Sequence, residues 1–189
     1  MDWDNCYVTG ETPWEKGIAH PELSRLLRNG SLSYPAGLEV LVPGCGLGHD
    51  VHELRDYGIQ AQGLDISKPA VQQANSIFVH EGDFFSAETK DQYAELGGIW
   101  EHTCFCAISP VQRPDYVETI ACLLKPGREL HGIFFINPDH DEPGPPYGVD
   151  LDELRTRFSS HFDWMEDFVP ERTYEGREGR ELYVRLRRK

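Results

Sequence analysis

Short apolar runs alternate with amphipathic segments in the first third of the chain. Residues 38–42 (LEVLV) end at a Pro-Gly pair, which is typical of a buried strand that leads into a turn. Residues 49–57 place two apolar side chains three positions apart and stop at a glycine, as an amphipathic helix does. Residues 59–64 alternate apolar and polar and end at Asp65, which predicts a second strand. These three segments form one strand-helix-strand unit of an α/β fold.

The rest of the chain continues this alternation. A short helix with leucines at helical spacing precedes the first strand, and Ser67 caps a helix after the second. The last two strands, separated by a charged turn, are expected to form an antiparallel hairpin at the edge of the sheet. Further helices are predicted over 21–28, 68–74, 110–124 and 150–158, and further strands over 77–79, at the start of the apolar segment 99–108, and over 130–136, 162–169 and 181–187.

The composition bounds the class of protein. A chain of 189 residues buries a core without disulfides or metal, so residues 1–189 are expected to form one domain. With 18 basic against 32 acidic residues, the net charge of −14 repels phosphate backbones and anionic lipids and argues against nucleic acid or membrane partners. Five cysteines are an odd set, which predicts free thiols and a cytoplasmic location. No apolar run reaches the length of a membrane span. We also expect the protein to be a monomer.

The turn after the first predicted strand carries the strongest chemical signal. Gly44, Gly46 and Gly48 permit a tight turn and a close approach of the backbone to a ligand. Asp65 follows Gly44 by 21 positions (65 − 44), the spacing at which an acidic residue accepts the hydroxyls of a ribose. The third glycine of a dinucleotide fingerprint is replaced by His49, which argues against NAD. A nucleoside-bearing cofactor without a pyrophosphate is the first hypothesis.

Three aromatic residues stand in a polar N-terminal segment that has no clear periodicity. Trp3, Tyr7 and Trp14 either plug the core or line a ligand, and the sequence leaves both open. Asp83 and Phe84 follow the strand predicted over 77–79, at the edge where open α/β sheets bind ligands. They are candidates for an adenine pocket, the alternative being a surface acid beside a core phenylalanine.

His102 stands where the strand within residues 99–108 is expected to end, so it can contact a cofactor or a substrate. On an extended strand His102, Cys104 and Cys106 would share one face, but packing cysteines explain this pattern more simply, and no metal site is expected. The proline-rich loop 137–149 is a candidate lid or substrate wall that carries Tyr147. His140 in the same loop is expected to be exposed.

Several motifs are distributed over most of the chain. They are Trp3, Tyr7 and Thr12-Pro13-Trp14, VLVPGCGLGHD at 40–50, GLDIS at 63–67, GDFF at 82–85, FCAI at 105–108, RPDY at 113–116, LLKPG at 123–127 and GPPY at 144–147. Together these motifs resemble the thiopurine S-methyltransferase-like family, and within it the halide/thiol methyltransferase branch. The resemblance implies a single-domain, Rossmann-like class I methyltransferase with helices on both faces of a seven-stranded, mostly parallel sheet whose last strand is antiparallel. It also implies S-adenosylmethionine as the methyl donor.

The resemblance assigns a role to each candidate residue of the cofactor site. Asp65 is expected to hold the ribose, and residues 1–30 are expected to form a cofactor-covering arm and helix. His102, which stands where relatives often carry tyrosine or arginine, is expected at the site as well. The other expected contacts are Gly44 and Gly46 at the methionine moiety, Asp83 and Phe84 at adenine, Trp3, Tyr7 and Trp14 over the cofactor, and Cys45 and Ile66 beside them.

The expected acceptor is a small soft nucleophile, foremost a thiol or hydrosulfide. A thiol loses a proton before or during transfer whereas a halide does not, so His102 is a candidate general base and Tyr147 a second catalytic candidate. Halides and larger heteroaromatic thiols remain alternative acceptors. Outside this class, the sequence leaves open a non-catalytic protein that binds S-adenosylmethionine. It also leaves open a nicotinamide-dependent oxidoreductase, although His49 in place of the third glycine argues against that class.

Overall fold

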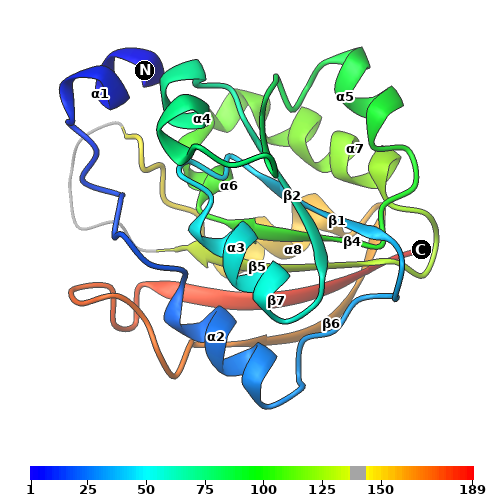
Figure 1. Ribbon diagram of the computed structural model, residues 1–189. Helices are drawn as coiled ribbons and strands as arrows, with labels where there is room; N and C mark the ends of the chain where they lie inside the picture. Colours follow the sequence, from blue (N-terminus) through cyan, green and yellow to red (C-terminus); the bar gives the residue numbers. More distant parts are fainter. Residues whose placement is uncertain (137–143) are drawn as a thin grey trace.

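A computed structural model describes residues 1–136 and 144–189. Its centre is a seven-stranded sheet with the order β3-β2-β1-β4-β5-β7-β6 (Figure 1). β7 runs antiparallel to both of its neighbours, and the other neighbouring pairs are parallel, as expected. The strands are β1 (Glu39–Pro43), β2 (Gln60–Asp65), β3 (Val79–Glu81), β4 (Gly98–His102), β5 (Glu129–Phe135), β6 (Phe162–Phe168) and β7 (Glu181–Arg188).

Helices cover both faces of the sheet. The α2 and α3 helices bury leucines and a valine against one face, where Val40 and Trp100 lie, whereas α7 and α8 pack on the other face against Phe134. None of the described helices is long and apolar enough to cross a membrane. The helices are α1 (Trp3–Thr9), α2 (Pro21–Arg28), α3 (His49–Asp56), α4 (Lys68–Ala74), α5 (Ala87–Gln92), α6 (Cys104–Ala107), a 3-10 turn (Pro110–Gln112), α7 (Arg113–Leu123) and α8 (Leu151–Phe158).

The strand order reverses between β1 and β4, and this reversal decides where a ligand can bind. From β1 the chain builds outward through β2 to β3, and then crosses to β4 on the other side of β1. The loops at the carboxyl ends of β1 and β4 therefore diverge and leave a crevice between them. The glycine turn and His102 both lie at this edge.

The N-terminal segment contains a helix that the sequence analysis did not predict. Asp2 caps α1 by accepting a hydrogen bond from the backbone N–H of Asn5 (3.0 Å), and Gly10 ends it with φ of 75°. The amide of Gln73 on α4 donates to the carbonyl of Tyr7 (2.9 Å), which ties α1 to α4. Residues 3–9 are therefore helical although the segment shows no clear periodicity.

The main differences from the predicted elements lie between residues 77 and 107. The third strand begins at Val79 because Ile77 is 81% exposed, whereas Val79 packs into the sheet. After His102 the backbone of Thr103 takes a left-handed conformation (φ 62°) and the chain enters α6, so Cys104 and Cys106 lie on a helix and share no strand face with His102. The α5 helix was not predicted. His140 and part of the proline-rich loop 137–149 lie outside the described residues.

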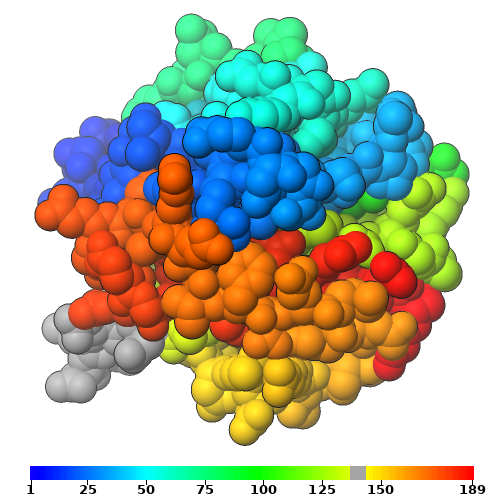
Figure 2. Space-filling model, turned by 90° about the horizontal axis from the view of Figure 1, so that it is seen from below, coloured from blue at the N-terminus to red at the C-terminus, as the bar shows by residue number. Residues whose placement is uncertain are grey.

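Segments that are far apart in the sequence meet beneath the sheet. In Figure 2 the blue α2 helix lies beside the orange segment that precedes β7. The backbone N–H of Arg172 donates to the buried carboxylate of Glu22 (3.0 Å) across 150 positions of sequence. This contact fixes the loop 169–180 against α2 and brings its end to the ligand-binding edge.

Candidate active site

A cavity of about 550 Å³ opens at the carboxyl edge of the sheet. The glycine turn forms its floor, and the N-terminal segment, the end of β4, the first residues of α6 and the loop before β7 form its walls. Nine of the residues expected at the cofactor site line it together, which the sequence could not show directly. They are Trp3, Tyr7, Trp14, Gly44, Cys45, Gly46, Asp65, Ile66 and His102.

The two glycines of the floor are required by their conformation and by their neighbours. Gly44 has φ of +59°, and a Cβ atom there would lie 2.9 Å from the Sγ of Cys104. Gly46 has φ of +53°, and a Cβ atom there would lie 2.8 Å from the hydroxyl of Tyr7. Because side chains are excluded at both positions, the backbone of the turn itself faces the cavity.

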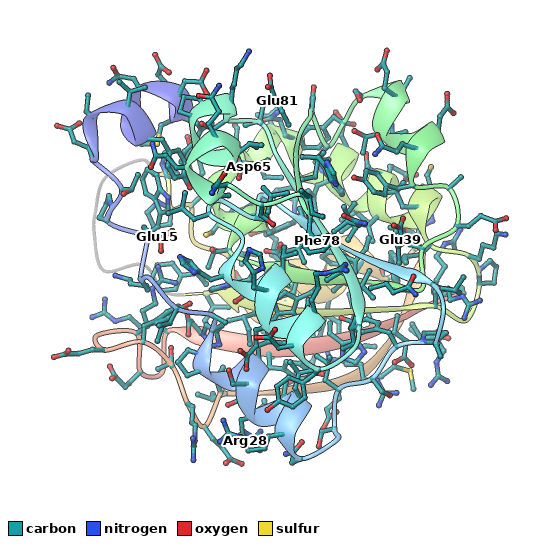
Figure 3. All side chains as sticks on the ribbon, in the orientation of Figure 1. Glu15, Arg28, Glu39, Asp65, Phe78 and Glu81 are labelled. Atoms are coloured by element: carbon teal, nitrogen blue, oxygen red, sulfur yellow. The ribbon has the colours of Figure 1, made fainter. Side chains whose placement is uncertain are left out.

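Asp65 ends β2 and is 8% exposed. One carboxylate oxygen accepts a hydrogen bond from the N–H of Gly46 and the other from the N–H of Ser67, each at 2.8 Å. Burial raises the pKa of Asp65, and these two N–H groups counteract the rise. In Figure 3 Asp65 and Glu15 lie toward one end of the sheet, and Glu39, which begins β1, lies toward the opposite end. The carboxylate has about four acceptor positions, so two stay free for a ligand.

Aromatic rings of the N-terminal segment form the wall above the glycine turn. The indole N–H of Trp14 donates to the hydroxyl of Tyr7 (3.2 Å), and the rings of Trp3 and Trp14 meet edge to face with centroids 5.4 Å apart. Burial raises the pKa of Tyr7 to about 12, so its hydroxyl stays protonated. The carboxylate of Glu15 pairs with His49 at 2.8 Å and joins this wall to the start of α3.

His102 is held by Asp50, which the sequence analysis did not select. The Nδ1 of His102 lies 2.7 Å from Oδ2 of Asp50, which also accepts from the indole N–H of Trp100 at 2.7 Å. The other oxygen of Asp50 accepts from the backbone N–H of His20 (2.8 Å). Burial disfavours the charged forms of both partners, but their mutual attraction prevails: the pKa of Asp50 falls well below its usual range, and that of His102 rises.

A second buried imidazole-carboxylate pair lies next to His102. The nearest ligand atoms of His20, His102 and Glu181 lie within 4.8 Å of one another, which raises the question of a metal site. The Nδ1 of His20 accepts from the N–H of Glu22 (3.2 Å), so a neutral ring carries its proton on Nε2, 2.9 Å from Glu181. This hydrogen-bonded pair is satisfied without an ion, because a metal on Nε2 would displace that proton. Sequence reasoning missed the pair because 161 positions separate its members.

Three predicted residues are not among the described residues that line the cavity. Phe84 is 7% exposed and packs against Tyr116 with ring centroids 5.1 Å apart, as a core residue does. The carboxylate of Asp83 accepts from the N–H of Phe85 (2.9 Å). The N–H of Tyr147 donates to the carbonyl of Cys106 (2.7 Å), and its carbonyl accepts from the buried Arg113 (3.0 Å). The roles of Asp83, Phe84 and Tyr147 at the site stay predictions.

The sequence model of the thiopurine S-methyltransferase family matches residues 1–175. A probable thiol methyltransferase 2 of Arabidopsis thaliana is 36% identical over 158 residues, which cover 80% of this chain and 68% of the relative. A thiocyanate methyltransferase 1 of Brassica oleracea is 38% identical over 158 residues, which cover 78% of this chain and 66% of the relative. A thiopurine S-methyltransferase of Pseudomonas fluorescens (strain SBW25) is 30% identical over 168 residues, which cover 75% of this chain and 75% of the relative. The chain thus spans about two thirds of the length of the two plant relatives.

Solved structures of methyltransferases share the fold. The 1,6-didemethyltoxoflavin-N1-methyltransferase of Burkholderia thailandensis, solved with 1,6-didemethyltoxoflavin and S-adenosylhomocysteine bound, gives a TM-score of 0.74 at 19% identity and covers 100% of this chain and 86% of its own. A TehB-like S-adenosylmethionine-dependent methyltransferase of Corynebacterium glutamicum gives 0.68 at 17% identity, with 99% and 94% covered. At such low identities the likeness establishes the fold and leaves the acceptor open.

Proposed function

The chain belongs to the thiopurine S-methyltransferase family and is an S-adenosylmethionine-dependent S-methyltransferase, and from that premise we propose that it methylates the sulfur of a small thiol or of hydrosulfide. The observation that carries the choice of acceptor is the Nε2 atom of His102. His102 lines the cavity, and its Nε2 atom is buried and has no hydrogen-bond partner among the described residues. A basic nitrogen placed there can take the proton of a thiol.

The cavity fits S-adenosylmethionine on the chain's own geometry. The two free acceptor positions of Asp65 suit the hydroxyls of a ribose, and the exposed backbone of the glycine turn suits the methionine moiety. Cys45 and Ile66 line the wall next to these groups, and the rings of the N-terminal segment cover it. The bound cofactor supplies a methyl group already activated by the positive charge of its sulfur.

The work left to the protein is therefore positioning, exclusion of water and management of one proton. Apolar and aromatic walls exclude water, and the cavity holds the acceptor in line with the methyl group. His102 manages the proton of a thiol acceptor. Names of the relatives add support, since two of them are called thiol and thiocyanate methyltransferases. Iodide and a heteroaromatic thiol are the alternative acceptors to be compared.

The test is a panel of hydrosulfide, small alkyl thiols, aromatic thiols and iodide with wild type, His102→Ala and the control His52→Ala. His52 is an exposed histidine of α3, so its replacement removes an imidazole away from Asp50. We expect thiols to exceed iodide in kcat/KM, and His102→Ala to lower thiol turnover about 100-fold while iodide turnover changes little. Equal losses for both acceptors would refute a general base, and turnover of no panel member would refute the acceptor class.

A further inference from the structure

We infer that Asp50 is a positioning residue that fixes the tautomer of His102, so that the Nε2 atom of this ring is the acceptor of the thiol proton. This inference rests on the proposed function and extends it to a residue that acts through the His102 ring. It predicts that thiol and halide methylation depend differently on a carboxylate that is buried within the cavity wall.

The hydrogen bonds of Asp50 determine which nitrogen of His102 carries a proton. The backbone N–H of His20 and the indole N–H of Trp100 can only donate, and they hold the carboxylate from both sides at 2.8 and 2.7 Å. The third contact of Asp50 is Nδ1 of His102, at 2.7 Å. An ionised carboxylate only accepts, so Nδ1 must donate and Nε2 of a neutral ring must be bare.

The neighbours of His102 fix the plane of its ring. The ring of Tyr174 stacks on it with centroids 5.9 Å apart and an interplanar angle of 23°, and the ring of His20 meets it at 76° with centroids 4.8 Å apart. His20 is engaged through both nitrogens and cannot take over the proton. Asp50 and the two rings therefore fix the orientation of the His102 ring. No described residue forms a hydrogen bond to its Nε2 atom.

The charge around His102 allows the ring to become cationic. Glu181 favours the protonated ring, but it is already paired with Arg177 at 3.1 Å, and Arg177 opposes protonation. Asp50 gives the stronger attraction. The titratable and charged groups that face the ring are Asp50 from α3, His20 from the segment before α2, Glu101 from β4, Tyr174 and Arg177 from the loop before β7, and Glu181 from β7.

The proton balance of the step then follows. The S–H bond of the acceptor breaks and its proton passes to Nε2 of His102. The electron pair of the acceptor sulfur forms the new S–C bond with the methyl carbon. The bond between that carbon and the donor sulfur breaks, and its pair stays on the donor, which becomes a neutral thioether. Asp50 stabilises the imidazolium until the proton leaves to solvent. A halide brings no proton, so its methylation needs neither group.

The experiment forces the opposite tautomer. In Asp50→Asn the amide NH₂ group would face the indole N–H of Trp100, which can only donate a hydrogen bond. We therefore combine this substitution with Trp100→Phe, which removes the indole N–H. The amide nitrogen then faces Nδ1 of His102, which must accept, and the proton moves to Nε2. The matched reference is Trp100→Phe alone, in which the carboxylate and the original tautomer remain.

Relative to Trp100→Phe, the double variant is expected to lose about 100-fold in kcat/KM for an alkyl thiol and less than threefold for iodide. At a pH at which the His102 ring is neutral, nitrogen-15 NMR of the ligand-free protein should show the proton on Nδ1 in the reference and on Nε2 in the double variant. Unchanged thiol turnover with the switched tautomer, or an equal loss for thiol and iodide, would overturn the inference, as would a reference spectrum with the proton on Nε2. Failure of the wild-type protein with every acceptor would instead refute the proposed function, and the NMR result would still decide the tautomer.

Discussion

Replacement of Asp65 by alanine tests the cofactor site most directly. Its carboxylate has about four acceptor positions, and the N–H groups of Gly46 and Ser67 take two of them. Two remain for the ribose of S-adenosylmethionine. A hydrogen bond to a charged group contributes about 1.5–3 kcal/mol, so the loss of both should weaken binding by about 3 kcal/mol or more, on the order of 100-fold in Kd or greater.

The same substitution also disturbs the free protein, and the assay has to separate the two effects. Asp65→Ala leaves two backbone N–H groups without their acceptor, which lowers stability by about 1–3 kcal/mol for each buried group left unsatisfied. Calorimetric titration with S-adenosylmethionine and with its demethylated product should therefore be run well below the melting temperature of the variant. The matched control is Glu81→Ala, because Glu81 pairs with Asp65 in the sheet register and is exposed (Figure 3).

Two results would refute this reasoning. If folded Asp65→Ala binds the cofactor with the wild-type Kd, the carboxylate stabilises the turn and does not bind the cofactor. If Glu81→Ala weakens binding as much as Asp65→Ala, the effect is one of net charge and not of hydrogen bonds at the end of β2.

Two further predictions concern the floor of the cavity and a buried acid. Gly46→Ala should weaken cofactor binding at least tenfold because its Cβ would displace the Tyr7 hydroxyl, whereas Gly10→Ala, equally left-handed but with nothing within 4 Å, should not; similar Kd values by calorimetry would contradict this. Burial raises the pKa of Glu101 to about 7 despite the hydrogen bonds that it accepts. Between its ordinary value of 4.5 and about 7 the folded state holds more protons than the unfolded state, so stability should fall by about 3 kcal/mol as pH rises through this range. Glu101→Gln should abolish that slope in melting curves, and an unchanged slope would assign it to another group.

The sequence predicted the elements that depend on local pattern and missed those that depend on distant contacts. The turn at residues 44–46 and the acid at Asp65 follow from spacing within one strand-helix-strand unit. The α1 helix was missed because a helix of seven residues shows little periodicity, although Asp2 at its start is a capping signal. The segment 99–108 is apolar apart from Glu101, His102 and Thr103, and periodicity cannot separate a buried strand from the buried α6 helix that follows it.

The environment of His102 marks the limit of sequence reasoning at the site. Its position at the end of a strand was enough to select it, because carboxyl ends of parallel strands share an edge. Its partner Asp50 lies 52 positions away, and the neighbouring pair of His20 and Glu181 is formed by opposite ends of the chain. Only the packing of α2 and α3 against the sheet that contains β4 and β7 brings these groups together.

The placement of the tryptophans gives the protein a built-in optical reporter. Of its four indoles, those of Trp3 and Trp14 line the cavity, and that of Trp100 donates to Asp50. Trp164 lies on β6 and donates to Asp167, outside the set of residues that line the cavity. Ligand binding should therefore change the emission of the first two and leave that of Trp164 as an internal reference. Unlabelled protein in a fluorimeter can thus report cofactor binding, and Trp164→Phe would remove the constant background.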